Sequence, residues 1–151
     1  CKIAHNVFLG VVMQNLVEIT VLAEKAGVPR LDFLDFMNNS VMGSVFTRYK
    51  TNAIVNLDWT TTFTPELLRK DLDLGLSAAR NLGVPVPVTA ATREALQAHF
   101  GMATLKSDPE AYLQQDFAAI METVATHAGL TLKSENQYYP TGLEVPAQAA
   151  E

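Results

Sequence analysis

Two polar residues near the start of the chain have the types and the spacing for chemistry on an oxygen-rich ligand. Lys2 and Asn6 stand four positions apart at the beginning of a long apolar stretch. If that stretch is helical, both side chains lie on one face. A lysine ammonium can donate a proton and a carboxamide can hold an oxygen atom, so the pair has the groups to bind a small oxygenated substrate. The same spacing also fits an ordinary exposed lysine near a helix end.

A second polar group follows Phe63 and includes Lys70 and Asp71. Glu66 and Lys70 are spaced i, i+4 in the favourable order, and an exposed pair of this kind stabilises a helix by about 0.3–0.5 kcal/mol. The simplest interpretation of Lys70 is therefore a solvated helix pair. Asp71 and Asp73 are two positions apart, so on a helix they face different ways and are not expected to share a proton or a metal ion.

The sequence lacks the common patterns for binding phosphate groups and metal ions. It contains neither G-x-G-x-x-G nor G-x-x-x-x-G-K-[ST]. His5, His99 and His127 lie far apart without the spacing of metal ligands, so we interpret them as surface or satisfied histidines and expect no metal site. Cys1 is the one cysteine, which excludes a disulfide within the chain and fits a reducing compartment such as the cytoplasm.

Caps and apolar periodicity predict that helices position these residues. Thr64 is a favoured N-cap, Pro65 fits the first helical position and Gly83 suits a C-terminal end, so the helix between them is the most clearly delimited. Asp108 and Pro109 open the last helix in the same way. The predicted helices span residues 2–26, 30–37, 44–50, 65–82, 89–100 and 108–128.

The remaining segments are predicted to be irregular, which makes the fold class all-α. Residues 52–62 include a run of strand composition, but no partner strand is visible and we predict a loop. Alternating prolines keep residues 84–88 extended. Residues 1–133 then form one helical domain, and residues 134–151 form an irregular tail. The tail residues expected to contact the body are Tyr138, Tyr139 and Leu143.

The composition supports a folded domain and excludes several classes of protein. The 151 residues are 48% apolar and 18% charged, so the chain can bury a core. A net charge of −5 excludes the basic surface that binds duplex DNA or an anionic membrane. The apolar stretch 3–17 carries polar residues, so we predict neither a membrane span nor a signal peptide. The first helix is apolar on all sides, which predicts that it is buried, in part against another domain or another copy of the chain.

Taken together, these motifs resemble the β-hydroxyacid dehydrogenase family, which includes the 3-hydroxyisobutyrate dehydrogenases and the tartronate semialdehyde and glyoxylate reductases. The likeness spans residues 2–130 and rests on four motifs in the same order. They are Lys2-x-x-x-Asn6 opening a long apolar helix, Ala23-Glu24-Lys25-Ala26-Gly27, Phe63 seven residues before Lys70-Asp71-Leu72, and Asp116-Phe117-Ala118-Ala119-Ile120.

The resemblance implies a fold, a cofactor and partners. The fold is an orthogonal multi-helix domain built around a long N-terminal helix, as in C-terminal domains of the 6-phosphogluconate dehydrogenase-like type. In that family an N-terminal Rossmann domain, absent from this sequence, binds most of the NAD or NADP. Because the chain opens inside a helical pattern, we interpret it as the C-terminal domain alone and expect it to be inactive by itself. Expected partners are the Rossmann domain, a second copy in a homodimer and a small hydroxyacid, without nucleic acid or membrane.

The resemblance also gives each site residue a role. Lys2 would be the catalytic acid and base, and Asn6 would bind the substrate or hold Lys2. Lys70 would contact the cofactor, Phe63 would pack near its nicotinamide end, and Asp71 would orient the neighbouring groups. Because imine-reducing relatives replace the lysine, Lys2 favours a β-hydroxyacid or its aldehyde acid as substrate. An alternative is a helical dimerisation or interaction module without catalysis, which would need only the apolar pattern.

Overall fold

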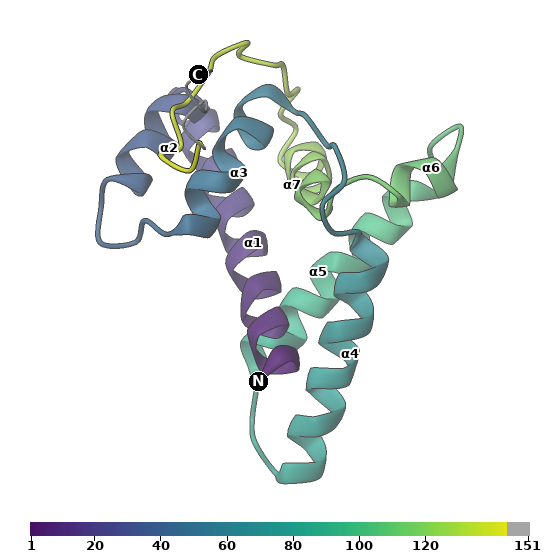
Figure 1. Cartoon of the computed structure of the whole chain (residues 1–151). Coiled ribbons are helices and arrows are strands. Elements are labelled where there is room, and N and C mark those ends of the chain that lie inside the picture. The colour runs from purple at the N-terminus through teal and green to yellow at the C-terminus, as the bar shows by residue number, and fades with distance from the viewer. Residues whose placement is uncertain (145–151) are drawn as a thin grey trace, which may run out of the picture.

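The long helix α1 (Lys2–Lys25) is the element around which the other helices pack. The computed structural model describes residues 1–144. In it α1 contacts α2, α4, α5 and α7, and α2 in turn packs against α3 (Figure 1). Every regular element of the described residues is a helix, which confirms the all-α prediction. The other elements are α2 (Arg30–Asn38), α3 (Val45–Asn56), α4 (Pro65–Leu82), α5 (Pro87–Ala103), α6 (Pro109–Leu113), the 3-10 helix η1 (Phe117–Ala119) and α7 (Ile120–His127).

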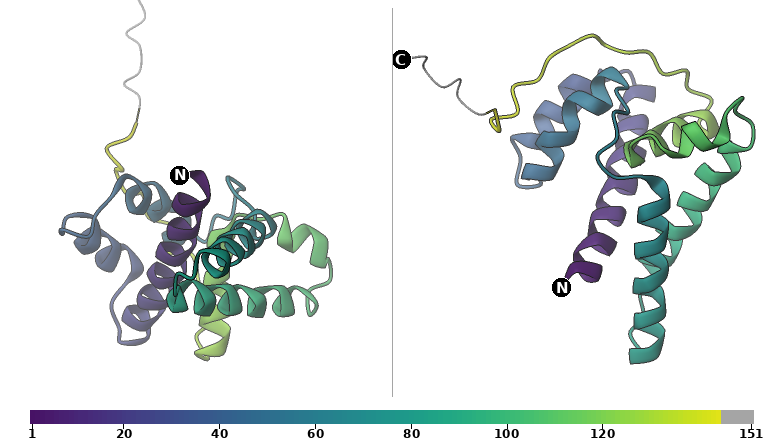
Figure 2. Two further views of the ribbon diagram at one scale, coloured as in Figure 1. Left: turned by 90° about the horizontal axis from the view of Figure 1, so that it is seen from below. Right: turned by 45° about the vertical axis from the view of Figure 1, so that its right-hand side comes forward.

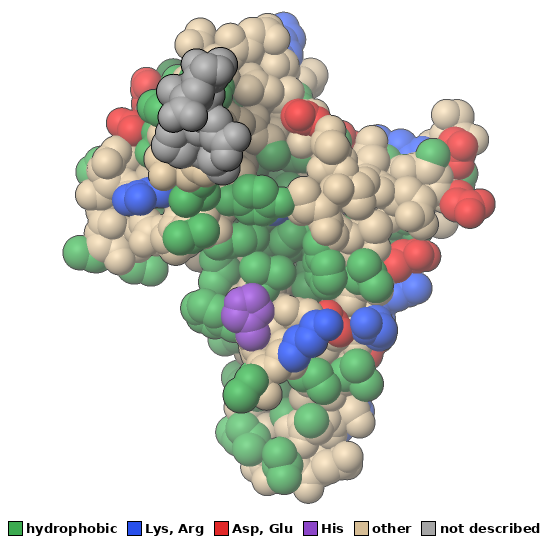
Figure 3. All heavy atoms as spheres, in the orientation of Figure 1, with side chains coloured by type: hydrophobic (Ala, Val, Ile, Leu, Met, Phe, Trp, Pro, Cys, Tyr) green, Lys and Arg blue, Asp and Glu red, His purple; other side chains and the backbone are tan. Residues whose placement is uncertain are grey.

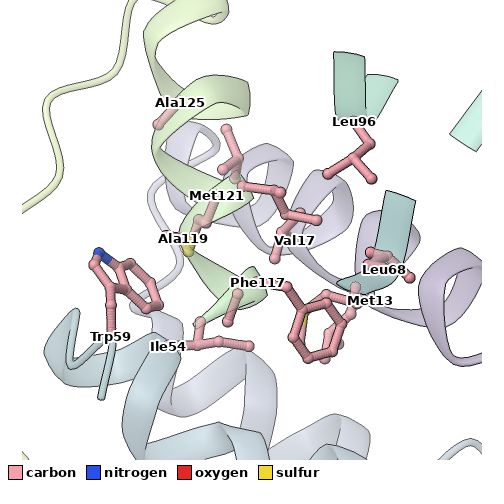
Figure 4. Packing of buried hydrophobic residues seen from close by; sticks show 14 of the residues in the cluster. Met13, Val17, Ile54, Trp59, Leu68, Leu96, Phe117, Ala119, Met121 and Ala125 are labelled. Carbon is pink, nitrogen blue, oxygen red and sulfur yellow. The ribbon is translucent and has the colours of Figure 1, made fainter. Parts of the chain in front are cut away.

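The hydrophobic core forms where α1, α4 and α7 meet. Met13 and Val17 of α1 pack in one cluster with Leu68 of α4, Met121 of α7 and Phe117, and all five side chains are buried (Figure 4). Burial of each such side chain contributes about 1.5–3 kcal/mol. The central position of α1 therefore follows from the apolar residues that it places in this cluster.

Two glycines let α1 and α4 approach each other closely. A Cβ on Gly10 of α1 would stand 2.7 Å from Leu68 Cδ1, and a Cβ on Gly75 of α4 would overlap the side chain of Val7. Neither position has room for a side chain without a shift. The contact sets the distance between the polar residues one turn before each glycine, Asn6 on α1 and Asp71 on α4.

Local caps define α3 and α4, and the structure corrects the predicted end of α3. The Thr64 hydroxyl accepts a hydrogen bond from Leu67 N, and Gly83 has a φ of 67°, so the prediction of helix 65–82 is confirmed. Ser44 begins α3 with a capping box, but the helix continues past residue 50 to Asn56. The continuation places Ile54 and Val55 in the core, so burial overrides the irregular local pattern.

The predicted single last helix, 108–128, is wrong. Asp108 and Pro109 begin a helix as predicted, but α6 ends at Leu113 and the chain restarts as η1 and α7. The break arises because Asp116 N donates to Trp59 O and Phe117 N donates to Phe63 O instead of to carbonyls of their own helix. Pairing with the loop before α4 therefore replaces one turn of helix.

Helix α5 begins earlier and ends later than predicted. It starts at Pro87, where the missing N–H would have no partner, and it passes Gly101 to end at Ala103. Consequently the extended segment is shorter than residues 84–88. The hairpin of α4 and α5 reaches beyond the start of α1 (Figure 2).

Helix α1 leaves part of its apolar surface uncovered by the other helices of this chain. Phe8 is 68% and Leu22 is 63% exposed, because the helices of this chain cover only part of its circumference. By length and composition alone α1 is long and apolar enough to cross a membrane, and the prediction that it does not span one stays a prediction. Core helices of soluble proteins can be equally long and apolar, and α1 packs against four other helices of this chain.

The chain after α7 lies against α2 and α3 without forming a helix. The Glu135 carboxylate accepts hydrogen bonds from the backbone N–H groups of Arg30 and Leu31 at the start of α2. Tyr139 is buried and exchanges backbone hydrogen bonds with the Asn52 side chain, as the predicted tail contact requires. Two other expected contacts are wrong, since Tyr138 and Leu143 are exposed. The predicted tail beyond residue 144 lies outside the described residues.

Candidate functional site

The start of α1 and the middle of α4 meet at the predicted polar residues. Asn6 Nδ2 donates a 2.6 Å hydrogen bond to Asp71 Oδ2, which joins the two helices. Asp71 is only 6% exposed, so its carboxylate is largely held between them. Lys2 lies one helical turn before Asn6 and is exposed. Figure 3 shows basic side chains beside a carboxylate over this region, next to a large hydrophobic area.

The bond to Asp71 orients the Asn6 carboxamide. An ionised carboxylate only accepts hydrogen bonds, so Asn6 must turn its nitrogen toward α4. The amide oxygen then faces His5, whose Nδ1 lies 3.2 Å from Asn6 Oδ1. With the amide oxygen facing His5 and one amide hydrogen on Asp71, the second amide hydrogen of Asn6 is the group left for a ligand.

Lys70 belongs to the same group through an ion pair with the residue that follows it. Its Nζ lies 3.4 Å from Asp71 Oδ1, and the side chain is 60% exposed. Among residues 1–144, the ion pair of Lys70 is with Asp71 and not with the predicted partner Glu66. An exposed pair of this kind contributes about 0–1 kcal/mol, so the Lys70 ammonium remains available to an anionic ligand.

Asp73 and Phe63 lie apart from this group. Asp73 pairs with Arg93 of α5 at 2.6 Å, which confirms that Asp71 and Asp73 face different ways. Phe63 precedes α4, and its half-buried ring stands edge-on to Phe117 with 5.6 Å between ring centroids. The structure therefore unites Asn6, Lys70 and Asp71 and holds Phe63 separately.

A hollow of about 280 Å³ adjoins the site on the side of His5. Its walls come from the first turns of α1 and from the segment that leads into α3, and they are mostly apolar. The lining residues are His5, Phe8, Leu9, Val12, Met42, Ser44, Phe46 and Thr47. No cluster of three or more potential metal ligands occurs among the described residues.

A buried ion pair near Phe63 is the main feature that the sequence did not reveal. Lys50 of α3 and Asp116 are 3% and 1% exposed, and Lys50 Nζ lies 2.7 Å from Asp116 Oδ1. Burial raises the pKa of the Asp116 carboxyl, but hydrogen bonds from Lys50, Thr62 and the Ala118 N–H outweigh it and hold the pKa below its usual range. The only sequence signal was the place of Asp116 in a family motif, because the partners are 66 positions apart.

The three histidines behave as interpreted, with one exception. His5 and His127 are exposed. His99 is completely buried; its Nδ1 lies 2.9 Å from Thr123 Oγ1, while its Nε2 has no hydrogen-bond partner. Burial lowers the pKa of His99 to about 4, which keeps the ring neutral near pH 7. The ring packs on Tyr112 with 4.9 Å between ring centroids, and we assign it to structure.

Comparisons with known proteins agree with this architecture. Residues 1–121 match the family model described as NAD-binding of NADP-dependent 3-hydroxyisobutyrate dehydrogenase. The chain is 29% identical over 134 residues to 3-sulfolactaldehyde reductase of Escherichia coli, covering 87% of this chain and 42% of the reductase. It is 29% identical over 114 residues to 2-(hydroxymethyl)glutarate dehydrogenase of Eubacterium barkeri, covering 75% of this chain and 38% of that enzyme. It thus spans less than half the length of these relatives.

Another relative is named as a nuclear factor and not as a reductase or dehydrogenase. The cytokine-like nuclear factor N-PAC of Aedes aegypti is 33% identical over 85 residues, which are 56% of this chain and 15% of that protein. Among solved structures, 3-hydroxyisobutyrate dehydrogenase of Salmonella typhimurium aligns with a TM-score of 0.67 at 24% identity, over 80% of this chain and 40% of the enzyme. The Mycobacterium tuberculosis enzyme aligns with a TM-score of 0.66 at 23% identity, over 82% and 42%. Because the fold is shared and the family model matches residues 1–121, this chain belongs to the NAD-binding family of NADP-dependent 3-hydroxyisobutyrate dehydrogenase.

Proposed function

We propose that this chain is the helical domain of an NAD(P)-dependent oxidoreductase that acts on a small β-hydroxyacid or its aldehyde acid. The observation that carries the proposal is the 2.6 Å hydrogen bond between Asn6 and Asp71, with Lys70 on the same carboxylate. It brings three residues of two separate motifs together, one turn from Lys2. A purely structural helix pair would not need a lysine, a carboxamide and a carboxylate in this arrangement.

Each side chain then has one task. Lys2 donates a proton to the substrate oxygen in the reduction direction and accepts it in the oxidation direction. Asn6 donates its second amide hydrogen to the substrate oxygen, and Asp71 fixes the orientation of Asn6. Lys70 offers a positive charge to the cofactor, and Phe63 offers an aromatic surface near the nicotinamide end.

The residues present fit only one side of a nicotinamide cofactor. Lys70 suits an anionic group and Phe63 suits a flat ring, but the sequence contains no phosphate-binding glycine loop. When bound, the nicotinamide supplies or accepts the hydride. We therefore place most of the binding of NAD or NADP on a Rossmann domain of the same protein, and we expect this chain alone to be inactive.

The exposed apolar residues of α1 support two further partners. Phe8 and Leu22 lie on a helix that this chain covers only in part. We propose that the Rossmann domain and a second copy of the helical domain cover the rest, giving a homodimer. The single free cysteine, Cys1, suits a soluble reducing compartment such as the cytoplasm.

Replacement of Lys2 tests the proposal directly. In the full-length protein that contains this chain, Lys2→Ala should lower kcat roughly 10²- to 10⁴-fold, because a positioned proton donor is lost. The dissociation constant of the cofactor should not change. Lys133→Ala, which removes another exposed lysine, is the matched control and should leave kcat unchanged. Equal losses of turnover and cofactor affinity in Lys2→Ala would contradict the proton-transfer role.

A second candidate function is a helical dimerisation or interaction module without catalysis. The 33% identity to a protein named as a nuclear factor, rather than as a dehydrogenase, favours it. On this alternative, the full-length protein would dimerise but would oxidise no β-hydroxyacid with either NAD or NADP. Sedimentation and steady-state turnover, measured on the same preparation, separate the two candidates.

A further inference from the structure

The loop that carries Phe63 is attached to a distant part of the chain. Besides the two backbone bonds that interrupt the last helix, the Thr61 hydroxyl donates to Gln114 O. Residues 59–63 thus run beside residues 114–117 although about 55 positions separate them. Loops held at several points along their length keep one conformation.

The Asp116 carboxylate is the centre of this attachment. Its Oδ2 accepts hydrogen bonds from the Thr62 N–H at 3.0 Å, from the Thr62 hydroxyl at 2.6 Å and from the Phe63 N–H at 3.3 Å. Its Oδ1 accepts from the Ala118 N–H and from the Lys50 ammonium. Lys50 also donates to the Thr62 hydroxyl at 2.9 Å. One buried carboxylate therefore fixes the backbone at Thr62 and at Phe63.

Burial of the charges makes this arrangement hard to distort. Lys50 and Asp116 are almost completely removed from solvent, and a buried ammonium without its carboxylate is strongly destabilising. Any shift of the loop away from Asp116 gives up several hydrogen bonds to a charged group at once. The ring of Phe63 is held at the same time by its edge-on contact with Phe117, which lies directly after Asp116.

We propose that Asp116, with Lys50 as its counter-ion, is a positioning residue that holds Phe63 where it meets the nicotinamide end of the cofactor. This inference rests on the proposed function. Phe63 also directly precedes Thr64, the N-cap of α4, so the same carboxylate sets the start of the helix that bears Lys70 and Asp71. Asp116 acts through Phe63 and touches neither substrate nor cofactor.

The experiment replaces the hydroxyl that binds Asp116 and leaves the buried ion pair intact. Asp116→Asn is unsuitable alone, because the buried Lys50 would lose its charged partner and the domain would be strongly destabilised. Thr62→Val keeps the shape of the side chain and removes the bond. In the full-length enzyme Thr62→Val should raise the cofactor KM about tenfold with little change in kcat, because a hydrogen bond to a charged group is lost. Thr62→Ser, which restores the hydroxyl, should return the cofactor KM to the wild-type value.

Two reference variants decide the interpretation. Thr60→Val removes an exposed hydroxyl of the same loop that bonds Asp58 instead of Asp116, and it should leave the cofactor KM unchanged. Phe63→Ala should weaken cofactor binding. If Phe63→Ala raises the cofactor KM and Thr62→Val does not, the positioning role is overturned while the proposed function stands. A wild-type enzyme that turns over no β-hydroxyacid with NAD or NADP overturns both.

Discussion

Asp71 connects the polar groups of the candidate site at the scale of single residues. Its Oδ2 accepts a hydrogen bond from the Asn6 amide of α1, and its Oδ1 faces the Lys70 ammonium of its own helix, α4. Because the carboxylate is nearly buried, water competes poorly for these bonds. The orientation of Asn6 relative to Lys2 thus depends on a residue that need not touch the substrate itself.

Replacement of Asp71 by asparagine should therefore impair substrate handling. In Asp71→Asn the charge is lost, and the new amide can turn either its oxygen or its nitrogen toward Asn6. We expect kcat/KM for the hydroxyacid to fall about 10- to 100-fold, the cost of a hydrogen bond to a charged group. Asp73→Asn is the matched control on the exposed side of the same helix. A similar loss in both variants would indicate a general effect on α4.

Local signals of the sequence predicted the elements whose ends are set locally. Thr64, Pro65 and Gly83 delimit α4 as predicted, because capping depends on residues within one turn. The break between α6 and α7 was missed, because it depends on bonds to a loop over 50 positions away. The same limit applies to the site. Lys2 and Asn6 follow from helical spacing, whereas the pairing of Lys50 with Asp116 depends on the tertiary fold.

The close contact of α1 and α4 predicts a specific response to added methyl groups. In Gly75→Ala the new Cβ overlaps the stiff, β-branched side chain of Val7, so the free energy of unfolding should fall by about 1–3 kcal/mol. Gly101→Ala is the matched control, because a Cβ at this position would meet no atom within 4 Å. In the control, the gain in helix propensity should stabilise the chain by about 0.5–1 kcal/mol. Urea unfolding of the two variants measures both changes. A free energy of unfolding in Gly75→Ala that is no lower than in the wild type would refute the close contact.

On the scale of the whole molecule, two of the places where buried polar groups gather outside the candidate site hold titratable side chains with shifted pKa values. One is the Lys50–Asp116 pair, whose charges neutralise each other. The other surrounds His99, where the Glu122 carboxylate accepts hydrogen bonds from Trp59 Nε1 and from the Tyr112 hydroxyl. Burial also raises the pKa of Tyr112, which keeps it neutral. The His99 group therefore has a charge state that the fold itself selects, and this links stability to pH.

His99 should make the chain less stable as the pH falls from about 7 to 4. Burial, only partly offset by Glu122 and reinforced by Lys106, lowers the pKa of His99 from 6.5 to about 4 in the folded chain. Between these values the unfolded chain binds the extra proton, so the stabilisation is complete above pH 6.5 and is lost as the pH falls toward 4. The free energy of unfolding should fall by at most about 3 kcal/mol over this range, at ~1.36 kcal/mol per pKa unit. Urea unfolding at several pH values should show a weaker pH dependence in His99→Gln and the wild-type dependence in His127→Gln, whose histidine is exposed. An equal pH dependence in the wild type and in His99→Gln would exclude His99 as its source.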